Sequence, residues 1–404
     1  MLRRPALIAL TALTLPSLAC PSTPGDEGGA ESNDEVAATT DDTDTTGDTG
    51  TDTGTDTDTG VPPEPATLTI MEEVVFYDGY AATVDEPVPE GVVRHSNSLL
   101  ATKLSDEQLD QIQTTIKLGV IVGALCDNYD RIGSVHLALV PKGQDSYVPA
   151  DVDRLEIARF ITPFMNMNKD PKSVPYQWQA DELATILRNE DLRAEYDFWM
   201  ELSIFGVPYA ANTEVPGCEG RNDTQLGTLL IYTDSSAPAQ PYNWLLPVAI
   251  KEPFNNYQEG ASDMLGTTRK TINFDLPSDA ELIQLVVITS NHGANQGGEE
   301  YIRRNHYAYV DGNLAMQYKP GRDSCEPFRM YNTQGNGIYG PSPRSDEEWQ
   351  SFSNWCPGDI IDTRTVSWGP FPAGTHEFVI EVPDATFNGG QGDFPFSLYI
   401  MAEL

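Results

Sequence analysis

The sequence is poor in positive charge and in long apolar runs. Its 404 residues carry 24 Lys and Arg against 61 Asp and Glu, which gives a formal net charge of −37. Proteins that bind phosphate backbones gather Lys and Arg, so this balance argues against a nucleic-acid partner. Beyond the N-terminal leader, no segment is apolar over the length that a membrane helix needs.

Cysteine and histidine are too dispersed for a familiar metal site. The five cysteines include no Cys-x-x-Cys pair, which argues against zinc. The five histidines include no adjacent or alternating pair, whereas copper favours clustered His and Met. We therefore expect neither a metal nor another cofactor. The histidines are His95, His136, His292, His306 and His376.

Residues 1–20 have the composition of a secretory signal peptide. Two arginines precede a short apolar run over residues 6–15, and Cys20 follows a Leu-Ala pair. The run is too short to span a bilayer, and the residues before Cys20 resemble a bacterial lipobox. The pattern predicts export and lipidation of Cys20, with the protein at the outer membrane or cell surface of a bacterium, or secreted. The alternative is a buried N-terminal strand or helix.

Residues 21–63 are expected to form a disordered tether. Positions 21–60 contain twelve Asp or Glu, no Lys or Arg, and repeats of the form TDTGTDTDTG. A segment of this composition has little to bury and repels itself, so it stays flexible and extended. The predicted lipid anchor and the folded body would therefore be joined by a flexible connection.

Short strand patterns separated by Gly and Pro dominate the rest of the chain. They fall into two blocks, 64–238 and 239–404, with only two brief helices expected, over residues 105–113 and 180–189. This is typical of antiparallel β-sandwiches rather than βαβ units, and two sandwiches of ordinary size fit the length. The expected strands cover residues 66–75, 115–122, 135–140, 154–164, 194–205, 229–232, 245–250, 271–274, 281–290, 306–310, 375–382 and 396–402.

A polar, glycine-rich loop in the second block is the first candidate for a site. Residues 285–289 are mostly β-branched and residues 306–310 alternate, so the loop joins two expected strands. A solvated surface loop is the ordinary alternative, since loops are polar for generic reasons. Its ionisable residues are His292, Glu299, Glu300, Arg303, Arg304 and His306.

Several short segments resemble one family when they are taken together. Residues 126–131, CDNYDR, and 157–163, IARFITP, are similar to the CDEWDR and IGRFITP segments of the bacterial peptide:N-glycosidase F family. Residues 298–306, GEEYIRRNH, resemble its CAEWCFRTH stretch, and residues 354–358, NWCPG, contain its WCPG. Each segment is short, but their order and approximate spacing match, which makes the set stronger than any one motif.

The resemblance implies a fold and a reaction. The fold is two eight-stranded jelly rolls packed side by side, with the site at their interface. The reaction is hydrolysis of the amide between asparagine and the first N-acetylglucosamine of an N-linked glycan. The family's catalytic aspartate falls on Asp130, its second-domain glutamate on Glu300 and its other glutamate on Glu201.

These residue types suit amide hydrolysis. An unactivated amide needs a base for water, a proton donor for the leaving amine and donors that hold the oxyanion. Carboxylates that share a partly dry site can divide the first two tasks, because their pKa values are pushed apart. Arginines are candidate oxyanion donors, and aromatic rings can stack on sugars or wall the cleft. The candidate substrate-binding residues are Arg131, Tyr129, Tyr301, Arg304, His292, His306 and Trp355.

Four cysteines remain if Cys20 carries lipid, and an even number in an exported chain suggests two disulfides. The family bridges the cysteine of its WCPG segment to one upstream in the same domain. The resemblance therefore implies a bridge between Cys325 and Cys356, which leaves Cys126 and Cys218 for the other.

Three functions remain open on the sequence alone. The first is an exported, metal-independent and monomeric amidase that acts on N-glycosylated peptides or proteins. The second is a surface glycan- or glycopeptide-binding protein that keeps the scaffold without turnover. The third is a copper monooxygenase, because that activity also occurs on paired jelly rolls, although the scattered histidines disfavour it. The first requires that Asp130 and Glu300, far apart in sequence, face one cleft.

Overall fold

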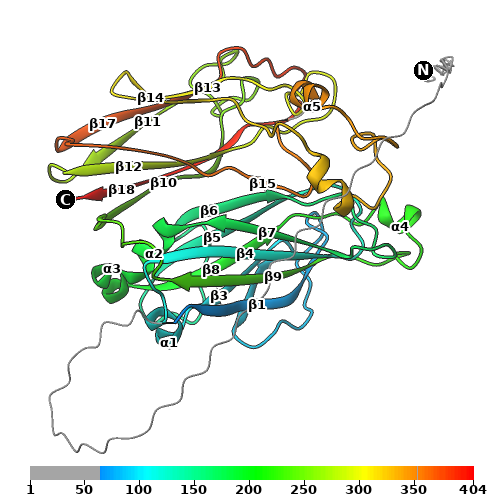
Figure 1. The fold of residues 1–404 in the computed structure, drawn as a ribbon, viewed down its shortest axis with the longest axis horizontal. Coiled ribbons are helices and arrows are strands. Elements are labelled where there is room, and N and C mark those ends of the chain that lie inside the picture. Colours follow the sequence, from blue (N-terminus) through cyan, green and yellow to red (C-terminus); the bar gives the residue numbers. More distant parts are fainter. Residues whose placement is uncertain (1–63, 353) are drawn as a thin grey trace, which may run out of the picture. The chain divides into compact units, whose positions relative to one another are not determined.

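The computed structural model describes residues 64–352 and 354–404. The signal peptide, Cys20 and the tether that are expected over residues 1–63 lie outside the described residues. The described chain is mostly antiparallel β-sheet, arranged in four sheets (Figure 1). No helix in this part combines the length and the apolar character needed to cross a membrane.

The first sandwich has jelly-roll topology. Its strands are β1 (Ala66–Tyr77), β2 (Val92–Ser96), β3 (Leu99–Lys103), β4 (Thr115–Ala124), β5 (Ile132–Pro141), β6 (Asp153–Ile161), β7 (Ser173–Gln179), β8 (Tyr196–Ile204) and β9 (Asp223–Asp234). One sheet has the order β1-β9-β4-β7, and β6-β5-β8-β3-β2 forms most of the other. The first and last strands, β1 and β9, therefore pair with each other in one sheet, with β1 at its edge. The short helices are α1 (Asp106–Asp110), α2 (Asp181–Arg188), α3 (Glu190–Glu195) and α4 (Ala211–Glu214).

The second sandwich repeats this topology. Its strands are β10 (Trp244–Pro253), β11 (Arg269–Leu276), β12 (Leu282–Thr289), β13 (His306–Val310), β14 (Asn313–Tyr318), β16 (Arg364–Trp368), β17 (Gly374–Glu381) and β18 (Pro395–Glu403). The sheets have the orders β10-β18-β12-β16 and β11-β17-β13-β14. The long connection from β14 to β16 contains η1 (Glu326–Tyr331), α5 (Asp346–Phe352) and β15 (Ile360–Ile361). The expected all-β fold of two jelly rolls is thus confirmed.

Strand β15 leaves its own sandwich and extends a sheet of the first one. Ile360 pairs with Phe160 and Ile361 with Arg159, so β15 becomes the edge strand beside β6. Nearby, Figure 1 shows β10 and β18 running beside the sheet that contains β5 and β6. Because β5 is covered on both faces, nearly all of its residues are buried and its burial pattern does not alternate.

A buried ion pair of the first sandwich lies at its contact with the second. Arg159 and Glu156, both on β6, are fully buried and form a bidentate pair, with nitrogen to oxygen distances of 2.8 and 2.6 Å. Arg159 also donates to the Ser290 hydroxyl and to the carbonyl of Pro395, each at 2.8 Å. Ser397 of β18 donates to Glu156. Arg159 and Glu156 thus find hydrogen-bond partners in both sandwiches.

The structure departs from the expected elements where local signals were weak. Helix α3 occupies the start of the strand expected over residues 194–205, because Asn189 caps it by accepting from the Leu192 N–H at 2.9 Å. Strands β2, β3, β7, β14, β15 and β16 were not expected. Strands β12 and β13, which flank the polar loop, lie in opposite sheets of the second sandwich. The loop therefore crosses from one layer to the other.

Both expected disulfides are present. The Cα atoms of Cys126 and Cys218 are 5.5 Å apart, and those of Cys325 and Cys356 are 5.4 Å apart. The first ties the end of β4 to the loop that follows β8. The second fastens η1 to the segment that leads into β15. Each bridge closes a loop that lines the pockets described below.

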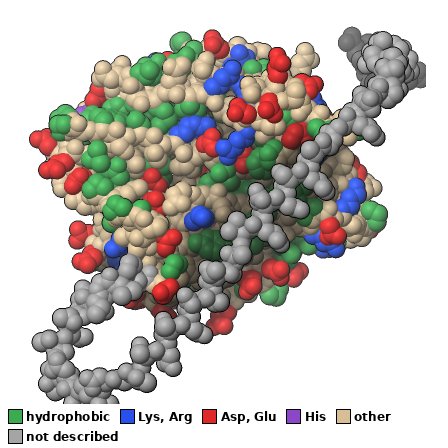
Figure 2. Space-filling model, viewed as in Figure 1, with side chains coloured by type: hydrophobic (Ala, Val, Ile, Leu, Met, Phe, Trp, Pro, Cys, Tyr) green, Lys and Arg blue, Asp and Glu red, His purple; other side chains and the backbone are tan. Residues whose placement is uncertain are grey.

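Acidic side chains do not form a single patch on the visible face of the described chain. Figure 2 shows Asp and Glu spread over it with Lys and Arg among them. Of the 61 acidic residues, twelve lie in the segment over residues 21–60. A dispersed acidic surface supports solubility and does not mark a docking face.

We predict that Glu156→Gln lowers the free energy of unfolding by about 3–5 kcal/mol, because it leaves Arg159 charged and unpaired in the interface. Burial alone would raise the pKa of Glu156, but Arg159 and Lys251 more than offset this and lower it to about 2. The stabilisation is therefore complete above the ordinary glutamate pKa and is lost as the pH falls toward 2. Urea unfolding at pH 7 and in acid measures it.

The matched control is Asp110→Asn, which breaks the exposed pair between Asp110 and Arg193. An exposed pair contributes about 0–1 kcal/mol, so this variant should unfold almost like the unmodified protein. If both variants cost the same small amount, the interface does not depend on the buried pair.

Candidate active site

Asp130 and Glu300 line one pocket. Its volume is about 180 Å³, and its lining comes from both jelly rolls. Asp130 lies just before β5, whereas Glu300 lies in the loop between β12 and β13. The structure thus brings the two carboxylates together across some 170 positions of sequence, as the amidase hypothesis requires. The lining residues are Asp130, Arg131, Ile132, Ile161, Phe205, His292, Glu300 and Trp355.

Asp130 has the electrostatics of a proton-transfer group. Burial raises its pKa, and the charge of Glu300 raises it further, to about 7, although Arg131 acts in the opposite direction. Among the described residues, no side chain donates a hydrogen bond to its carboxylate, so its oxygens remain available to water or substrate. A carboxyl group that titrates near neutral pH can accept and return a proton at little cost.

Glu300 is held more firmly than Asp130. Burial raises its pKa, while the Gly293 N–H and the Tyr301 hydroxyl favour its charged form by hydrogen bonding. The Gly293 N–H lies 2.9 Å from the carboxylate. In addition, the side-chain amide of Asn354 donates to the Glu300 carbonyl at 2.5 Å. These hydrogen bonds fix the position of Glu300, and they only partly offset the effect of burial, so its pKa stays above the ordinary glutamate value.

Arg131 is oriented into the pocket by a buried partner. Its Nε and one terminal nitrogen donate to Asp127 at 2.7 and 3.2 Å, and Asp127 is only 2% exposed. Asp127 also accepts from the backbone N–H groups of Tyr129 and Val207. This leaves the other terminal nitrogen of Arg131 without a protein partner among the described residues. Arg131 can therefore donate to a ligand while its position stays fixed.

His292 and Trp355 form one wall of the pocket. Their rings are stacked with centroids 5.9 Å apart, and the Trp355 indole donates to the Asn291 carbonyl at 2.9 Å. The Nε2 atom of His292 lies 2.7 Å from the Ser290 hydroxyl. Burial, together with the cations of Arg159 and Lys251, lowers the pKa of His292 to about 3. His292 is therefore neutral at physiological pH.

A second pocket of about 380 Å³ adjoins the first. Tyr129 and Tyr301, the chain neighbours of Asp130 and Glu300, line it, so the same two loops border both pockets. Its other side chains are one aromatic ring, three amides, one carboxylate and one isoleucine, a composition that can stack on and hydrogen bond a sugar. These residues are Asn128, Phe164, Glu214, Gln334, Asn336 and Ile338.

Arg304 and His306 are not at the site. Arg304 is engaged by the buried Glu299, with nitrogen to oxygen distances of 2.8 and 3.1 Å. His306 is fully buried on β13, where its ring stacks against Tyr318 at 4.9 Å and contacts Phe394. The strand alternation that starts at His306 turns its side chain into the core. The expected role of His306 is therefore corrected to packing in the core of the second jelly roll, whereas Arg304 pairs with Glu299 and lines neither pocket.

Glu201 also lies away from the pocket. It is fully buried at the middle of β8, where it contacts His136, Tyr147 and Arg154. Its cross-strand partner His136 is four residues along β5 from Ile132, a pocket residue, or about 13 Å at the usual rise of a strand. The expected role of Glu201 at the site is therefore corrected to an ion pair within the sheet.

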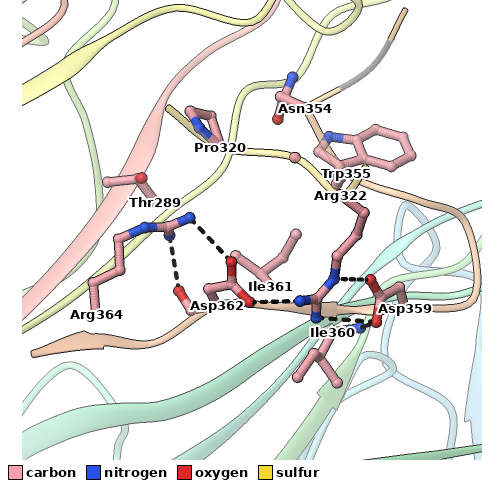
Figure 3. Close-up of a pocket in the computed structure, with 11 residues that line it drawn as sticks. Thr289, Pro320, Arg322, Asn354, Trp355, Asp359, Ile360, Ile361, Asp362 and Arg364 are labelled. Carbon is pink, nitrogen blue, oxygen red and sulfur yellow. Dashed lines mark hydrogen bonds and ion pairs between the residues drawn. The ribbon is translucent and has the colours of Figure 1, made fainter. Parts of the chain in front are cut away.

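A neighbouring small cavity has a structural function. Figure 3 shows Arg322 between Asp359 and Asp362, with Arg364 on the far side of Asp362. The cavity they border has a volume of about 10 Å³, which is room for about one water molecule. The chain of alternating charges fixes the segment around β15 against the second sandwich. It does not form a substrate site.

The loop after β8 contributes residues that the sequence did not suggest. Phe205 lines the pocket. Tyr209, which is 68% exposed, lies close enough to Arg131 to raise the pKa of its guanidinium. The disulfide between Cys126 and Cys218 holds this loop beside the Asp130 loop. The sequence contains one indication of this role. Cys218 lies in the same loop, and a disulfide between Cys218 and Cys126 places the loop beside the site.

Among the described residues, no three His, Cys, Asp or Glu side chains are arranged to hold a metal ion. The donor set that a copper site needs is therefore not assembled in this part of the chain. His95 and His136 both lie near Glu201, and neither lines the pocket.

Two sequence models of one family match the chain, each over one of the two jelly rolls. "Peptide-N-glycosidase F, N terminal" matches residues 67–220, and "Peptide-N-glycosidase F, C terminal" matches residues 261–401. The chain belongs to the peptide-N-glycosidase F family. The first match contains Asp130 and the second contains Glu300, so the pocket is assembled from both domains that define the family.

Solved structures of this family share the fold at low sequence identity. PNGF-II has a TM-score of 0.61 and 19% identity, with 84% of this chain and 65% of that chain covered. Recombinant peptide:N-glycanase F has a TM-score of 0.54 and 17% identity, with coverage of 84% and 95%. PNGase F from Flavobacterium meningosepticum, a glycosylasparaginase, has a TM-score of 0.51 and 16% identity, with coverage of 84% and 96%.

This chain spans slightly less than two thirds of PNGF-II. No curated protein sequence matches it. At these identities, the structural likeness establishes the fold, and the chemistry has to be argued from the side chains in the pocket.

We predict that Glu300→Gln lowers the pKa of Asp130, because it removes the negative charge that raises it. Carboxyl carbon NMR of the labelled protein, followed through a pH titration, measures the shift. Glu214→Gln is the control, since Glu214 lines the adjoining pocket but is not among the charges that act on Asp130. An unchanged Asp130 titration in Glu300→Gln would show that the two carboxylates are not coupled.

Proposed function

We propose that this protein is an exported amidase that hydrolyses the side-chain amide of asparagine bearing an N-linked glycan. The observation that carries the proposal is the pairing of Asp130 and Glu300 in one pocket, with the pKa of Asp130 raised to about 7. Membership of the peptide-N-glycosidase F family supports it. The proposed reaction is metal-independent, because side chains of the pocket can act as the base for water and as the hydrogen-bond donors for the oxyanion.

In the proposed reaction, ionised Asp130 takes a proton from water as the water oxygen attacks the amide carbon. The negative charge that develops on the amide oxygen is stabilised by the free terminal nitrogen of Arg131. The carbon to nitrogen bond then breaks, and the proton passes from Asp130 to the leaving nitrogen. The products are an aspartate side chain in the peptide and a glycosylamine. Glu300 keeps Asp130 basic enough for the first step.

The adjoining pocket is the proposed binding place of the first sugars. Tyr129 is 42% exposed and its ring is close to the Arg131 guanidinium, at 5.5 Å from the ring centroid. The exposed Tyr129 ring and the side-chain amides around it suit a neutral, hydroxyl-rich ligand. Because both pockets are bordered by the same loops, a sugar seated beside Tyr129 and Tyr301 would present its amide bond to Asp130.

We also propose that the protein works outside the cytoplasm, attached through lipidated Cys20 and the acidic tether. The support in the described chain is its two disulfides, which form and persist in oxidising compartments. A flexible connection of this kind would let a monomeric body reach large glycoproteins. Radiolabelled palmitate incorporation that is lost in Cys20→Ala tests the anchor, and no incorporation in the unmodified protein would contradict it.

The test of the activity is release of glycan from a denatured glycopeptide, with conversion of the glycosylated asparagine to aspartate followed by mass spectrometry. We predict that Asp130→Asn abolishes release with the fold intact, and that Glu300→Gln lowers kcat/KM by about 10²–10⁴-fold, the usual contribution of a group that assists proton transfer. Glu201→Gln should leave kcat largely unchanged at a temperature where it is folded, since Glu201 lies outside the pocket.

Each contrary outcome favours another function. Glycan binding without release by the unmodified protein would indicate the non-catalytic glycan-binding alternative. Release that is lost only with a chelator would indicate a metal. A loss in Glu201→Gln as large as that in Asp130→Asn would show that Glu201 acts in catalysis despite its position.

The proposed base also fixes the pH dependence. Since Asp130 must be ionised to act, kcat/KM should rise with pH through the Asp130 pKa of about 7. In Glu300→Gln, the residual activity should show this rise at lower pH, because the Asp130 pKa falls. A rise that stays at the same pH in both proteins would assign it to another group.

A further inference from the structure

A buried chain of side chains leads from the domain interface to His292. Glu156 binds Arg159, Arg159 donates to the Ser290 hydroxyl at 2.8 Å, and Ser290 lies 2.7 Å from His292 Nε2. Ser290 is 1% exposed, and Arg159 and Glu156 are buried at least as completely. These residues come from both jelly rolls. The proposed amidase mechanism does not use Glu156, Arg159 or Ser290.

The donors in this chain determine the direction of each hydrogen bond. An arginine only donates, so the Arg159 N–H occupies a lone pair of the Ser290 oxygen. The remaining hydrogen-bond partner of that hydroxyl among the described residues is His292 Nε2. Among the described residues, Nε2 is the one acceptor within reach of the hydroxyl proton, so donation to an unprotonated Nε2 is the arrangement that uses this proton.

The other ring nitrogen of His292 opens into the pocket. His292 lines the cavity beside Asp130 and Glu300. Among the described residues, Nδ1 has no hydrogen-bond partner. This atom is not buried, so a ligand can reach it. The ring itself is fixed by its stacking on Trp355 and by the backbone pairing of His292 with Asp393. An N–H at Nδ1 is thus available to a ligand in a defined position.

We propose that Arg159 and Ser290 are positioning residues that hold His292 as the neutral tautomer with its proton on Nδ1, so that it donates to the oxygen of the scissile amide. The donor role rests on the proposed amidase function, whereas the tautomer does not. A neutral imidazole suits this task. It can donate a hydrogen bond to a developing oxyanion, and it carries no positive charge that would offset the charge of the Asp130 carboxylate. Together with the free nitrogen of Arg131, His292 would complete a pair of donors.

Nitrogen NMR of histidine-labelled protein tests the tautomer without any substrate. The His292 signals are assigned by their loss in His292→Gln. At neutral pH we expect a proton on Nδ1 and none on Nε2, and we expect Ser290→Ala to shift the proton toward Nε2. A charged ring, or a proton on Nε2 in the unmodified protein, would overturn the proposal.

Kinetics on the denatured glycopeptide test the donor role. We predict that Ser290→Ala lowers kcat by about 10–10³-fold with a smaller change in KM, because a misplaced proton removes one oxyanion donor. Ser290→Thr, which keeps the hydroxyl, should restore most of kcat. Thr289→Val is the matched control: it removes a neighbouring buried hydroxyl that bonds Tyr318 and lies outside the pocket.

The two measurements separate the possible failures. If His292 carries its proton on Nδ1 but Ser290→Ala and Thr289→Val have the same kcat, the donor role is wrong. If the unmodified protein releases no glycan, the proposed function and the donor role both fail for that substrate, while the nitrogen spectra still confirm or overturn the tautomer. Thermal unfolding of each variant shows whether a kinetic loss reflects misfolding.

Discussion

The pairing of Arg159 with Glu156 is the interaction on which the arrangement of the site depends. The two jelly rolls share part of one apolar core, because Val286, Tyr399 and Met401 of the second pack with the core of the first, and the pocket lies where their faces meet. Arg159 makes this contact specific, because its guanidinium is satisfied by groups from both sandwiches, the Ser290 hydroxyl and the Pro395 carbonyl among them. A buried charge tolerates only an arrangement that supplies all of its partners. The two carboxylates of the pocket are therefore placed by an interaction that touches neither.

The fold could be predicted from the sequence further than the site could. Strand patterns and turn residues were enough to indicate two antiparallel sandwiches, since alternation survives where one strand face is exposed. Short edge strands such as β2 and β14 carry too few residues to give a pattern. Strand β15 has only two residues and owes its existence to pairing with β6, a contact that no local signal encodes.

The site residues differ in how well a short motif could locate them. Asp130 and Glu300 lie in loops whose ends are fixed by strands, so the similarity of these short segments to the family correctly predicted that both residues line one pocket. Glu201 and His306 lie within strands, where the side-chain direction depends on register, and a shift of one residue exchanges core and surface. Sequence similarity at a strand position therefore says little about the pocket into which a side chain points, and these expectations were wrong.

The charge state of the pocket follows from where the cations of the molecule are engaged. Arg131 is held by Asp127 through two nitrogen to oxygen contacts. Its charge lowers the pKa of Asp130 less than burial and the charge of Glu300 raise it, so that pKa is about 7.

The surroundings act in the opposite direction on His292, which lines the same pocket as Asp130. Burial lowers its pKa, and the cations of Arg159 and Lys251 lower it further, so the ring stays uncharged. One side of the cavity thus favours a proton on a carboxyl group and the other side opposes a charge on an imidazole. A base and a neutral donor can coexist at one pH because they are separated by these two differently charged surroundings, each set by pairs that lie outside the pocket itself.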